Sequence, residues 1–404
     1  MAFKRAKEKE DKNTQELTKI SQSGDIQEIR AALNDKYKSI IAPEVKDKPL
    51  IVLPSGILSM DLAIGNGGFV AGRVMDIFGW EATGKTLLCL AIAAYIQRCS
   101  KIDALGRIVK RVVAMLDAEG TFSNQLARSV GLETDNLILI QSTPKKILSG
   151  EDFFDIMVTL IGMGVDYIIV DSCPALTPMT ILANETGQGQ KATRAQLMSM
   201  GLEKITPLVN ANGQTLVHFI NQVRGKPMDM YKHEQETGGN ALKFFSSYRF
   251  QVVKGVDINK KVLGADGQYR EKKVGVTSCI RIVKNKTAPE PPYIPSTTYH
   301  FEYDVYFESF KDDLGIEYHR GVDIVKDYVL TGLRTGVITQ KSSWFSYGDK
   351  KANGMNDFIA VIKENPEILT KIREDVFTKM GSLPISPMET TVNVSAKDQE
   401  QSPD

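Results

Sequence analysis

One eight-residue segment constrains the fold of this 404-residue chain more than any other. It reads GWEATGKT, fits the pattern GxxxxGK[ST], and lies between an apolar β-type run, Val74–Phe78, and an apolar helical run, Leu87–Ala94. In such a loop the glycines let the backbone curl so that its N–H groups face phosphate oxygens. The helix that follows points its positive end at the same anion. The segment therefore predicts a phosphate-binding loop between a strand and a helix.

Each position of this loop has an expected part in nucleotide binding. Lys85 supplies a point charge to the β- and γ-phosphates, and Thr86 offers its hydroxyl to Mg²⁺. A glycine-rich turn without a ligand would also fit the bare pattern, but the position between strand and helix favours a site for ATP and Mg²⁺. The rest of the expected cradle consists of Gly79, Trp80, Glu81, Ala82, Thr83 and Gly84.

Two further apolar runs lead into carboxylates. The run from Tyr167 ends in Asp171, which is placed to hold Mg²⁺ through its water shell. The run Val112–Leu116 leads through Asp117 to Glu119, three residues beyond Leu116. Taken alone, either acid could be structural, as a strand-end, helix-capping or salt-bridged carboxylate. Beside a phosphate site, Glu119 becomes a candidate base that orients and deprotonates the attacking water.

A third apolar run, Leu216–Ile220, ends in the pair Asn221-Gln222. A neutral amide at that position could hydrogen-bond the γ-phosphate or the attacking water. Loss of this contact after hydrolysis would act as a switch.

The chain alternates between strand and helix signals over residues 50–305. Helical stretches such as Thr86–Arg98 and Gln196–Val209 separate the earlier apolar runs, and this alternation predicts βαβ units with a largely parallel sheet. Ligands bind such sheets at the carboxyl ends of the strands. The predicted strands are Arg73–Gly79, Arg111–Leu116, Leu137–Gln141, Tyr167–Asp171, Thr215–Ile220, Tyr248–Val253 and Thr277–Val283.

Composition excludes several classes of protein. With 42% hydrophobic and 25% charged residues, the chain as a whole is not intrinsically disordered. The 50 basic and 49 acidic residues leave a net charge of +1, which excludes a polycation that coats nucleic acid but permits a local basic groove. No apolar run reaches the 18 residues of a membrane span, the N-terminus lacks a signal-peptide core, and four scattered cysteines do not form a disulfide framework. A cytoplasmic protein is expected.

Four segments differ in character. Residues 1–49 form a charged arm with an amphipathic helix at 26–39, whose apolar side packs either on its own domain or on a neighbouring subunit. Residues 50–312 form the core, and residues 313–381 form a small α/β domain. That domain has helices at Val322–Arg334 and after Asn365-Pro366, and an aromatic strand at Ser343–Tyr347. Residues 382–404 read as a disordered tail.

Several blocks, in order along residues 26–381, resemble the RecA-type recombinases of bacteria and phages. They are PSGILSMDLAIGNGGFVAGRVMDIFG before the loop, LDAEG, IIVDSCPALTP, FINQVR, TGGNALKFF, IVKNK, SSWFSYGDKK and KENPEILTKIRE. The resemblance implies a P-loop NTPase of RecA type in the α/β class. It has a mostly parallel central sheet flanked by helices, an N-terminal helical arm and a small C-terminal domain.

The resemblance also implies roles for single residues. Glu119 matches the catalytic glutamate, and Gln222 matches the glutamine that couples the γ-phosphate to DNA binding. Lys284 and Lys286 match lysines that reach the neighbouring subunit's ATP, where a cation supplied in trans stabilises the transition state. From spacing alone, these two lysines would be solvated charges at a strand end.

Two segments, Ile181–Arg194 and Val223–Gly239, match the family's DNA-binding loops; without the resemblance they would be ordinary surface loops. Arg194 and Arg224 are expected to contact phosphates. The close-approach residues of the second loop are Thr237, Gly238, Gly239 and Asn240.

The adenine contact departs from the family pattern. The family's adenine-packing tyrosine aligns with Leu126, with Phe122 close by, and Tyr303 or Tyr306 is expected to supply the other aromatic face beside the base.

Together these features imply an ATP-dependent recombinase, a DNA-dependent ATPase that polymerises on single-stranded DNA as a helical filament. It would catalyse homologous pairing and strand exchange with duplex DNA, helped by single-strand-binding and loading proteins. Two alternatives use the same core: a ring-shaped helicase motor, and a non-catalytic assembly protein that binds ATP only to hold subunits together. The TGGNALKF and VKNK blocks argue against the helicase, and the set Lys85, Glu119 and Asp171 argues against the assembly protein.

Overall fold

The computed structural model describes residues 30–31, 50–103, 105–183, 190–224, 235–236, 239–264, 266–288, 300–313 and 315–381. The chain divides into two units, residues 1–50 and 51–404. In the first unit only Arg30 and Ala31, which are helical, and Leu50 are described. Most of the helix expected at 26–39 and the whole tail at 382–404 lie outside the described residues, so both stay predictions.

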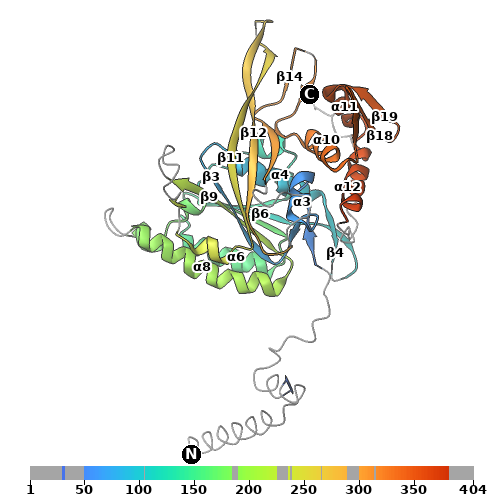
Figure 1. Cartoon of the computed structure of the whole chain (residues 1–404). Coiled ribbons are helices and arrows are strands. Elements are labelled where there is room, and N and C mark those ends of the chain that lie inside the picture. The colour runs from blue at the N-terminus through green and yellow to red at the C-terminus, as the bar shows by residue number, and fades with distance from the viewer. Residues whose placement is uncertain are drawn as a thin grey trace, which may run out of the picture. The chain divides into compact units, whose positions relative to one another are not determined.

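A ten-stranded sheet forms the centre of the second unit (Figure 1). Its strand order is β16-β13-β12-β11-β3-β9-β8-β6-β7, and β10 pairs with β9. The six strands from β11 to β7 are mutually parallel, whereas the remaining pairings are antiparallel. The strands span β3 Arg73–Gly79, β6 Val113–Asp117, β7 Leu137–Gln141, β8 Tyr167–Asp171, β9 Leu216–Arg224, β10 Gln235–Glu236, β11 Tyr248–Leu263, β12 Tyr269–Asn285, β13 His300–Tyr306 and β16 Gly321–Val322.

Alternate residues of the parallel strands face two different layers of helices. One face, which includes Met75 and Ile169, packs against α4 and α3. The other face, which includes Val74 and Ile168, packs against α6 and α8. Because both faces are covered, the parallel strands are apolar almost throughout. The α/β class with a mostly parallel central sheet flanked by helices is confirmed.

The helices of this core lie between the strands in sequence, as the alternation predicted. Among the described residues, no helix combines the length and the apolar character that a membrane crossing requires. The helices span α3 Leu58–Ile64, α4 Lys85–Arg98, α5 Asn124–Ser129, α6 Gly150–Gly162, α7 Met179–Ala183, α8 Gln190–Asn212 and α9 Ala241–Phe245. Two 3₁₀ turns lie at Thr134–Asn136 and Cys173–Ala175. Two short antiparallel pairs lie outside the main sheet, β1 Val52–Leu53 with β2 Phe69–Val70, and β4 Ser100–Ile102 with β5 Ile108–Lys110.

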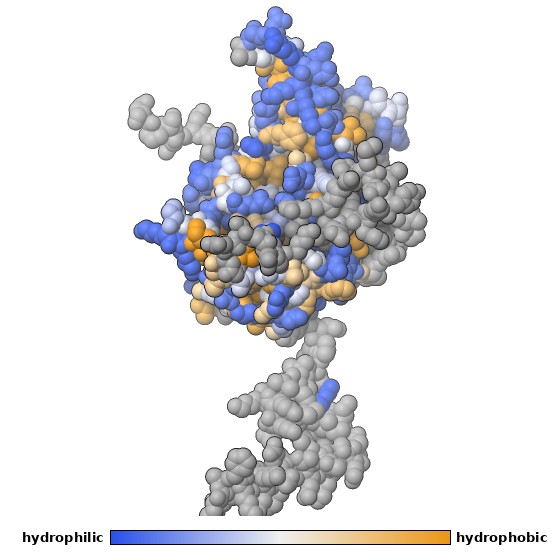
Figure 2. Space-filling model, turned by 90° about the vertical axis from the view of Figure 1, so that its left-hand side faces the viewer, coloured by the Kyte–Doolittle hydropathy of each residue, from blue (hydrophilic) through white to orange (hydrophobic). Residues whose placement is uncertain are grey.

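Strands β11 and β12 form a hairpin that is much longer than the sequence predicted. The apolar runs ended at Val253 and began again at Thr277, but the strands extend to Leu263 and from Tyr269. In β11 the added residues are exposed over 254–257 and then alternate between half-buried and exposed, and in β12 five exposed residues, 269–273, precede the buried Val274. The far end of the hairpin is mostly hydrophilic (Figure 2). Only the part of the hairpin that packs on the core carries the apolar pattern on which the prediction relied.

Residues from about 324 to 381 build a small α/β region. Its core joins its three helices to Leu58 and Leu62 of α3. The buried carboxylate of Asp61 on α3 also pairs with Arg373, whose Nη1 lies 2.7 Å from Asp61 Oδ2. The elements span α10 Ile324–Thr335, β17 Thr339–Lys341, β18 Trp344–Tyr347, β19 Lys350–Asn353, α11 Met355–Lys363 and α12 Glu367–Lys379, preceded by the pair β14 Phe310–Lys311 and β15 Glu317–Tyr318. The expected boundary at 312/313 stays a prediction.

Candidate nucleotide and DNA site

The carboxyl ends of five parallel strands place the polar residues singled out from the sequence along one edge of the sheet. In register, Gly79 of β3 pairs with Gln222 of β9, and Asp171 of β8 pairs with Asp117 of β6. Asp117 also pairs with Gln141 of β7. Residues that are more than 140 positions apart in the chain therefore meet at the edge where parallel sheets bind ligands.

The loop after β3 is tightly curled against the neighbouring strand. A Cβ atom at Gly79 would lie 2.3 Å from the carbonyl oxygen of Val252, so only glycine fits there. Gly84 adopts φ 84°, which suits glycine, and caps α4 without any side-chain hydrogen bond. The hydroxyl of Thr83 donates to the carbonyl of Trp80 at 2.9 Å. The first N–H groups of the 14-residue helix α4 thus have no side-chain cap and can receive an anion.

The ammonium of Lys85 is held inside this loop. Its Nζ donates to the carbonyl oxygens of Gly79 at 3.1 Å and Trp80 at 2.7 Å. Burial lowers the pKa of Lys85, and the nearby carboxylate of Asp171 opposes that shift. The Lys85 ammonium therefore donates to loop carbonyls in the same way that it would donate to phosphate oxygens of a bound nucleotide.

Thr86 and Asp171 form the second contact of the site. The Thr86 hydroxyl donates to Asp171 Oδ2 at 2.8 Å. Burial raises the pKa of Asp171 to about 6, and the negative charges of Glu119 and Asp117 add to that rise. A cation beside this carboxylate would stabilise its charged form. A hydroxyl and a carboxylate are hard oxygen ligands of the kind that Mg²⁺ binds together with phosphate oxygens.

The residues thus fit a metal held jointly with a nucleotide. Within the described ranges, no group of three or more His, Cys, Asp or Glu side chains could hold a metal by itself.

Glu119 is positioned by hydrogen bonds that the sequence did not reveal. The backbone N–H groups of Ala118 and Glu119 donate to the Asp171 carbonyl at 2.7 and 3.3 Å. The Ser172 hydroxyl donates to Glu119 Oε1, and Gln222 Nε2 lies 3.5 Å from the same oxygen. The carboxylate itself is exposed at the strand edge. Glu119 therefore faces solvent while its orientation is fixed by residues from β8 and β9.

Asp117 organises the loop that carries Glu119. It is buried, and its two oxygens accept the N–H of Gly120 at 2.9 Å, the N–H of Phe122 at 2.7 Å and the Gln141 amide at 2.7 Å. The sequence pointed only to the acid two residues later. A carboxylate followed by a glycine turn was the available signal for Asp117, and the hydroxyl directly after Asp171 was the signal for Ser172.

The backbone of Gln222 is hydrogen-bonded to the side chain of its neighbour on β9. The buried Asn221 accepts the Gln222 N–H through Oδ1 at 2.9 Å, and Asn221 Nδ2 makes no hydrogen bond within the described part of the chain. Gln222 thus joins the nucleotide edge to the end of β9, which continues to Arg224 and pairs there with Gln235.

Lys284 and Lys286 lie away from the chain's own phosphate loop. The Lys286 N–H donates to the carbonyl of Ser247, whose own N–H donates to Val74, five residues before Gly79 on β3. At about 3.3 Å per strand residue, this separation is roughly 16 Å, further than a lysine side chain extends. This separation keeps Lys286 away from the loop of the same chain, and Lys284 Nζ is engaged by backbone carbonyls outside that loop.

The surroundings of Lys284 are only partly solvated. Its Nζ donates to the carbonyls of Lys243 at 2.6 Å and Phe244 at 3.2 Å. Burial lowers the pKa of Lys284, and the charges of Lys286 and Arg249 lower it further. Phe244, whose carbonyl accepts one of the Lys284 hydrogen bonds, is 74% exposed.

The expected DNA-binding residues are partly described. Arg194 is half-buried on α8, and its Nε makes no hydrogen bond among the described residues. Gly239 and Asn240 form an exposed turn before α9, and a Cβ at Gly239 would lie 3.1 Å from that of Ala195. Gly239, at the end of the second segment, therefore lies close to α8, one residue beyond the first segment. Thr237, Gly238 and residues 225–234 lie outside the described residues.

The aromatic residues expected beside adenine are enclosed in the core. Tyr306 is 3% exposed, and its ring packs edge-on against Phe310 and Tyr318, with centroids 5.7 and 5.0 Å away. Tyr303 is 2% exposed. Leu126 packs against the core from α5. Neither tyrosine presents an open ring face, so the structure does not bring Tyr306 into the nucleotide site.

A parallel sheet with a phosphate loop after β3 and a carboxylate at the end of β8 defines a P-loop nucleotide-binding protein. Comparison with protein families gives two matches, the RecA N-terminal domain over residues 29–302 and the RecA C-terminal domain over residues 329–381.

Curated relatives extend this match. The chain is 32% identical to Protein RecA of Syntrophus aciditrophicus, over 83% of this chain and 86% of that protein. It is 34% identical to Protein RecA of a strain of Thermus thermophilus, over 84% and 88%, and 34% identical to Protein RecA of Mannheimia haemolytica, over 82% and 79%. The chain belongs to the RecA family. It is therefore a recombinase and a DNA-dependent ATPase that binds nucleotide, as its motifs implied.

Proposed function

We propose that the chain binds ATP with Mg²⁺ on the loop Gly79–Thr86 and hydrolyses it at the carboxyl edge of the sheet. The observation that carries this proposal is the meeting of Lys85, Thr86, Asp171 and Glu119 at that edge. Lys85 exchanges its loop carbonyls for phosphate oxygens, and Thr86 with Asp171 holds the metal. Mg²⁺, when bound, neutralises charge that develops on the phosphates.

Glu119 acts on the attacking water. Its exposed carboxylate is held by Ser172 and Gln222, so that one oxygen is engaged by these two donors. A base fixed in this way can orient a water and accept its proton. Gln222 senses the same region, because its amide approaches Glu119 while its backbone belongs to the strand that leads into the second DNA loop.

Lys284 and Lys286 serve the site of a neighbouring copy. The distance of Lys286 from its own loop and the exposure of Phe244, whose carbonyl accepts from Lys284, support a subunit interface at this surface. A head-to-tail interface that does not close produces a helical filament. ATP hydrolysis then depends on assembly, because each site receives its cations from the next subunit.

The filament holds single-stranded DNA through the two loops, with Arg194, Arg224 and the segment Thr237–Asn240 near its backbone. Because the net charge is only +1, attraction to DNA is local to these loops. The bases stay free to pair with a homologous duplex, which leads to strand exchange. We place this activity in the cytoplasm, assisted by single-strand-binding and loading proteins.

One experiment tests the proposal as a whole. ATP hydrolysis is measured with and without single-stranded DNA, and the same samples are examined by electron microscopy. We expect a rate that rises with DNA, together with open helical filaments. Closed hexamers that unwind forks would instead indicate a ring-shaped motor. A rate of ATP hydrolysis that does not change with single-stranded DNA would indicate an assembly protein that uses ATP only to hold subunits together.

A further inference from the structure

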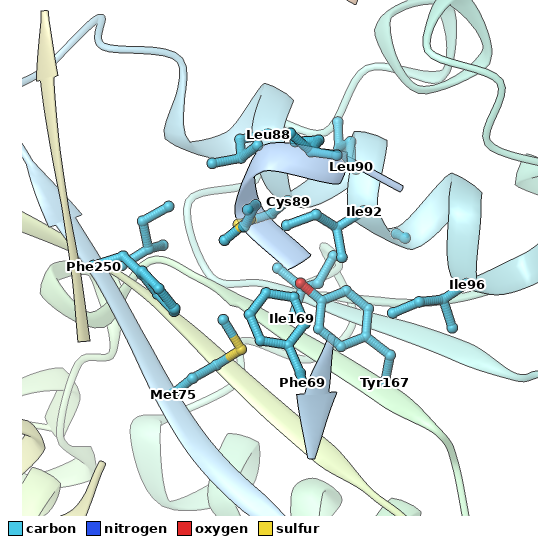
Figure 3. Packing of buried hydrophobic residues seen from close by; sticks show 14 of the residues in the cluster. Phe69, Met75, Leu88, Cys89, Leu90, Ile92, Ile96, Tyr167, Ile169 and Phe250 are labelled. Carbon is cyan, nitrogen blue, oxygen red and sulfur yellow. The ribbon is translucent and has the colours of Figure 1, made fainter. Parts of the chain in front are cut away.

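Three polar side chains lie fully buried in the core beneath the nucleotide site. The Tyr167 hydroxyl oxygen is 2.5 Å from His218 Nδ1, and Cys89 Sγ lies 3.7 Å from the same nitrogen and 3.9 Å from Nε2. All three residues have 0% of their surface exposed. Figure 3 shows Tyr167 of β8 and Cys89 of α4 among the apolar side chains of the same buried cluster. We call these residues the Tyr167–His218–Cys89 cluster.

Each member of the cluster lies four residues from a residue of the nucleotide site on the same element. Cys89 follows Lys85 on α4, one turn further along the helix. Tyr167 precedes Asp171 on β8, on the same face of the strand. His218 precedes Gln222 on β9 with the same spacing. The cluster therefore joins the three elements that carry the phosphate lysine, the metal carboxylate and the γ-phosphate sensor.

The cluster is electrically neutral. Burial lowers the pKa of His218 to about 3, so the imidazole carries one proton and one acceptor nitrogen at neutral pH. Burial also raises the pKa of the Tyr167 phenol and the Cys89 thiol well above their usual values. After burial, the negative charge of Asp171 raises the pKa of Cys89 further, and the positive charge of Lys85 lowers it. The cluster is a neutral hydrogen-bonded connection, and its thiol is not poised for reaction.

Polar groups are an expensive way to fill a core, because each one left unpaired costs free energy. Apolar side chains would fill the same space without that cost. Hydrogen bonds are directional, so a satisfied buried polar network fixes the relative positions of the elements that carry it.

We propose that the Tyr167–His218–Cys89 cluster locks α4, β8 and β9 in register, so that nucleotide-driven movement of Lys85 and Asp171 reaches Gln222 and the second DNA loop. His218 and Tyr167 are positioning residues in this scheme. The inference rests on the proposed function, in which ATP binding controls DNA affinity.

The test compares two buried tyrosines in the full-length protein. Tyr167→Phe removes the hydroxyl of the cluster. Tyr248→Phe is the matched control, because Tyr248 is also fully buried in the same core, and its hydroxyl accepts from the Val70 N–H at 2.8 Å and from the Thr287 hydroxyl at 2.8 Å. The readout is the ratio of single-stranded DNA affinity measured with a non-hydrolysable ATP analogue to that measured with ADP.

We expect Tyr167→Phe to reduce this ratio about tenfold, within the usual range for coupling between sites, while ATP affinity changes less than about twofold. Tyr248→Phe should leave the ratio unchanged. Equal ratios in wild type and Tyr167→Phe, or equal losses in both variants, would overturn the role of the cluster. A wild-type protein whose DNA affinity does not depend on nucleotide would overturn the proposed function as well.

A second variant separates the effect of the cluster on positioning from its effect on stability. It replaces the first variant if Tyr167→Phe folds poorly. In Tyr167→Phe/His218→Leu both polar partners are replaced by apolar groups, which can be nearly neutral for stability. We expect this double variant to regain the thermal stability of wild type but not the nucleotide-dependent ratio. Recovery of the ratio together with stability would mean that the cluster only supports the fold.

Discussion

Thr86 on α4 donates its hydroxyl proton to Asp171 at the end of β8, with the two oxygens 2.8 Å apart. This bond joins the two residues that we assign to Mg²⁺. It also opposes the burial that raises the pKa of Asp171 to about 6. Burial thus makes the charge of the Asp171 carboxylate unfavourable, and a bound cation would stabilise that charge.

The raised pKa of Asp171 predicts how stability depends on pH without nucleotide. Between about 3.8 and 6 the folded state keeps a proton that the unfolded state has lost, so this group's contribution to the free energy of unfolding falls as pH rises. The difference of about two pKa units corresponds to roughly 3 kcal/mol. Asp171→Asn should be more stable than wild type at pH 7.5 by up to that amount and should converge with it near pH 4.

Thermal denaturation of both proteins across this pH range provides the measurement. Mg²⁺ with ATP should stabilise wild type but not Asp171→Asn. An unchanged stability difference from pH 4 to 7.5 would contradict the assignment of the raised pKa to Asp171.

Glu119→Gln tests the assignment of the base. The amide keeps an oxygen for the Ser172 hydroxyl and removes only the proton acceptor. We expect the rate of ATP hydrolysis to fall by about 10²–10⁴-fold, the usual contribution of a general base, while ATP binding and ATP-dependent DNA binding persist. Single-turnover hydrolysis and nucleotide titration measure the two effects separately. A rate within a few-fold of wild type would remove Glu119 from the chemistry.

Lys284 and Lys85 allow a complementation test of catalysis across the interface. Lys284→Ala keeps an intact phosphate loop but cannot supply its neighbour, whereas Lys85→Met cannot use its own loop but still supplies Lys284. Each variant alone should hydrolyse ATP at least tenfold more slowly than wild type. An equimolar mixture on single-stranded DNA should recover a substantial part of the activity, and Lys284→Ala mixed with the double variant Lys85→Met/Lys284→Ala should not. Failure of the first mixture to exceed the sum of its components would place Lys284 outside the active interface.

The buried pair Asp61–Arg373 joins α3 to α12. Arg373 Nη2 also donates to the Gly67 carbonyl at 2.7 Å, and Asp61 accepts the Ser55 N–H at 2.8 Å. Arg373→Met should lower the free energy of unfolding by roughly 3–5 kcal/mol, because it leaves an uncompensated buried charge. Arg373→Met/Asp61→Asn should recover part of the loss in chemical denaturation. Equal losses in the single and double variants would mean that the charge of Asp61 is not the cause.

The sequence was sufficient to predict that the candidate site residues would meet at one edge of the sheet, because they lie at or just beyond strand ends. Lys85, Asp171 and Gln222 each follow a strongly apolar run, and parallel strands bring such ends together without further information. Ser172 could not be assigned in the same way, since its role depends on Glu119, a neighbour from another strand.

Other features escaped prediction because their surroundings, and not their spacing, define them. The outer part of the β11–β12 hairpin carries no apolar run, so its length was not apparent. Tyr306 looked available for adenine, but Phe310 and Tyr318 enclose its ring. His218 lies inside an apolar strand pattern, where a single polar residue carries no signal until Tyr167 and Cys89 are seen beside it.

The measurement that tests the central claim most directly is filament formation on single-stranded DNA by wild type and Lys85→Ala, each with ATP and Mg²⁺, followed by strand exchange with a homologous duplex in the same samples. We predict that wild type forms helical filaments and exchanges strands and that Lys85→Ala does neither, since the buried ammonium is the charge that the loop offers to the phosphates. Filaments and strand exchange by Lys85→Ala at the level of wild type would contradict the account.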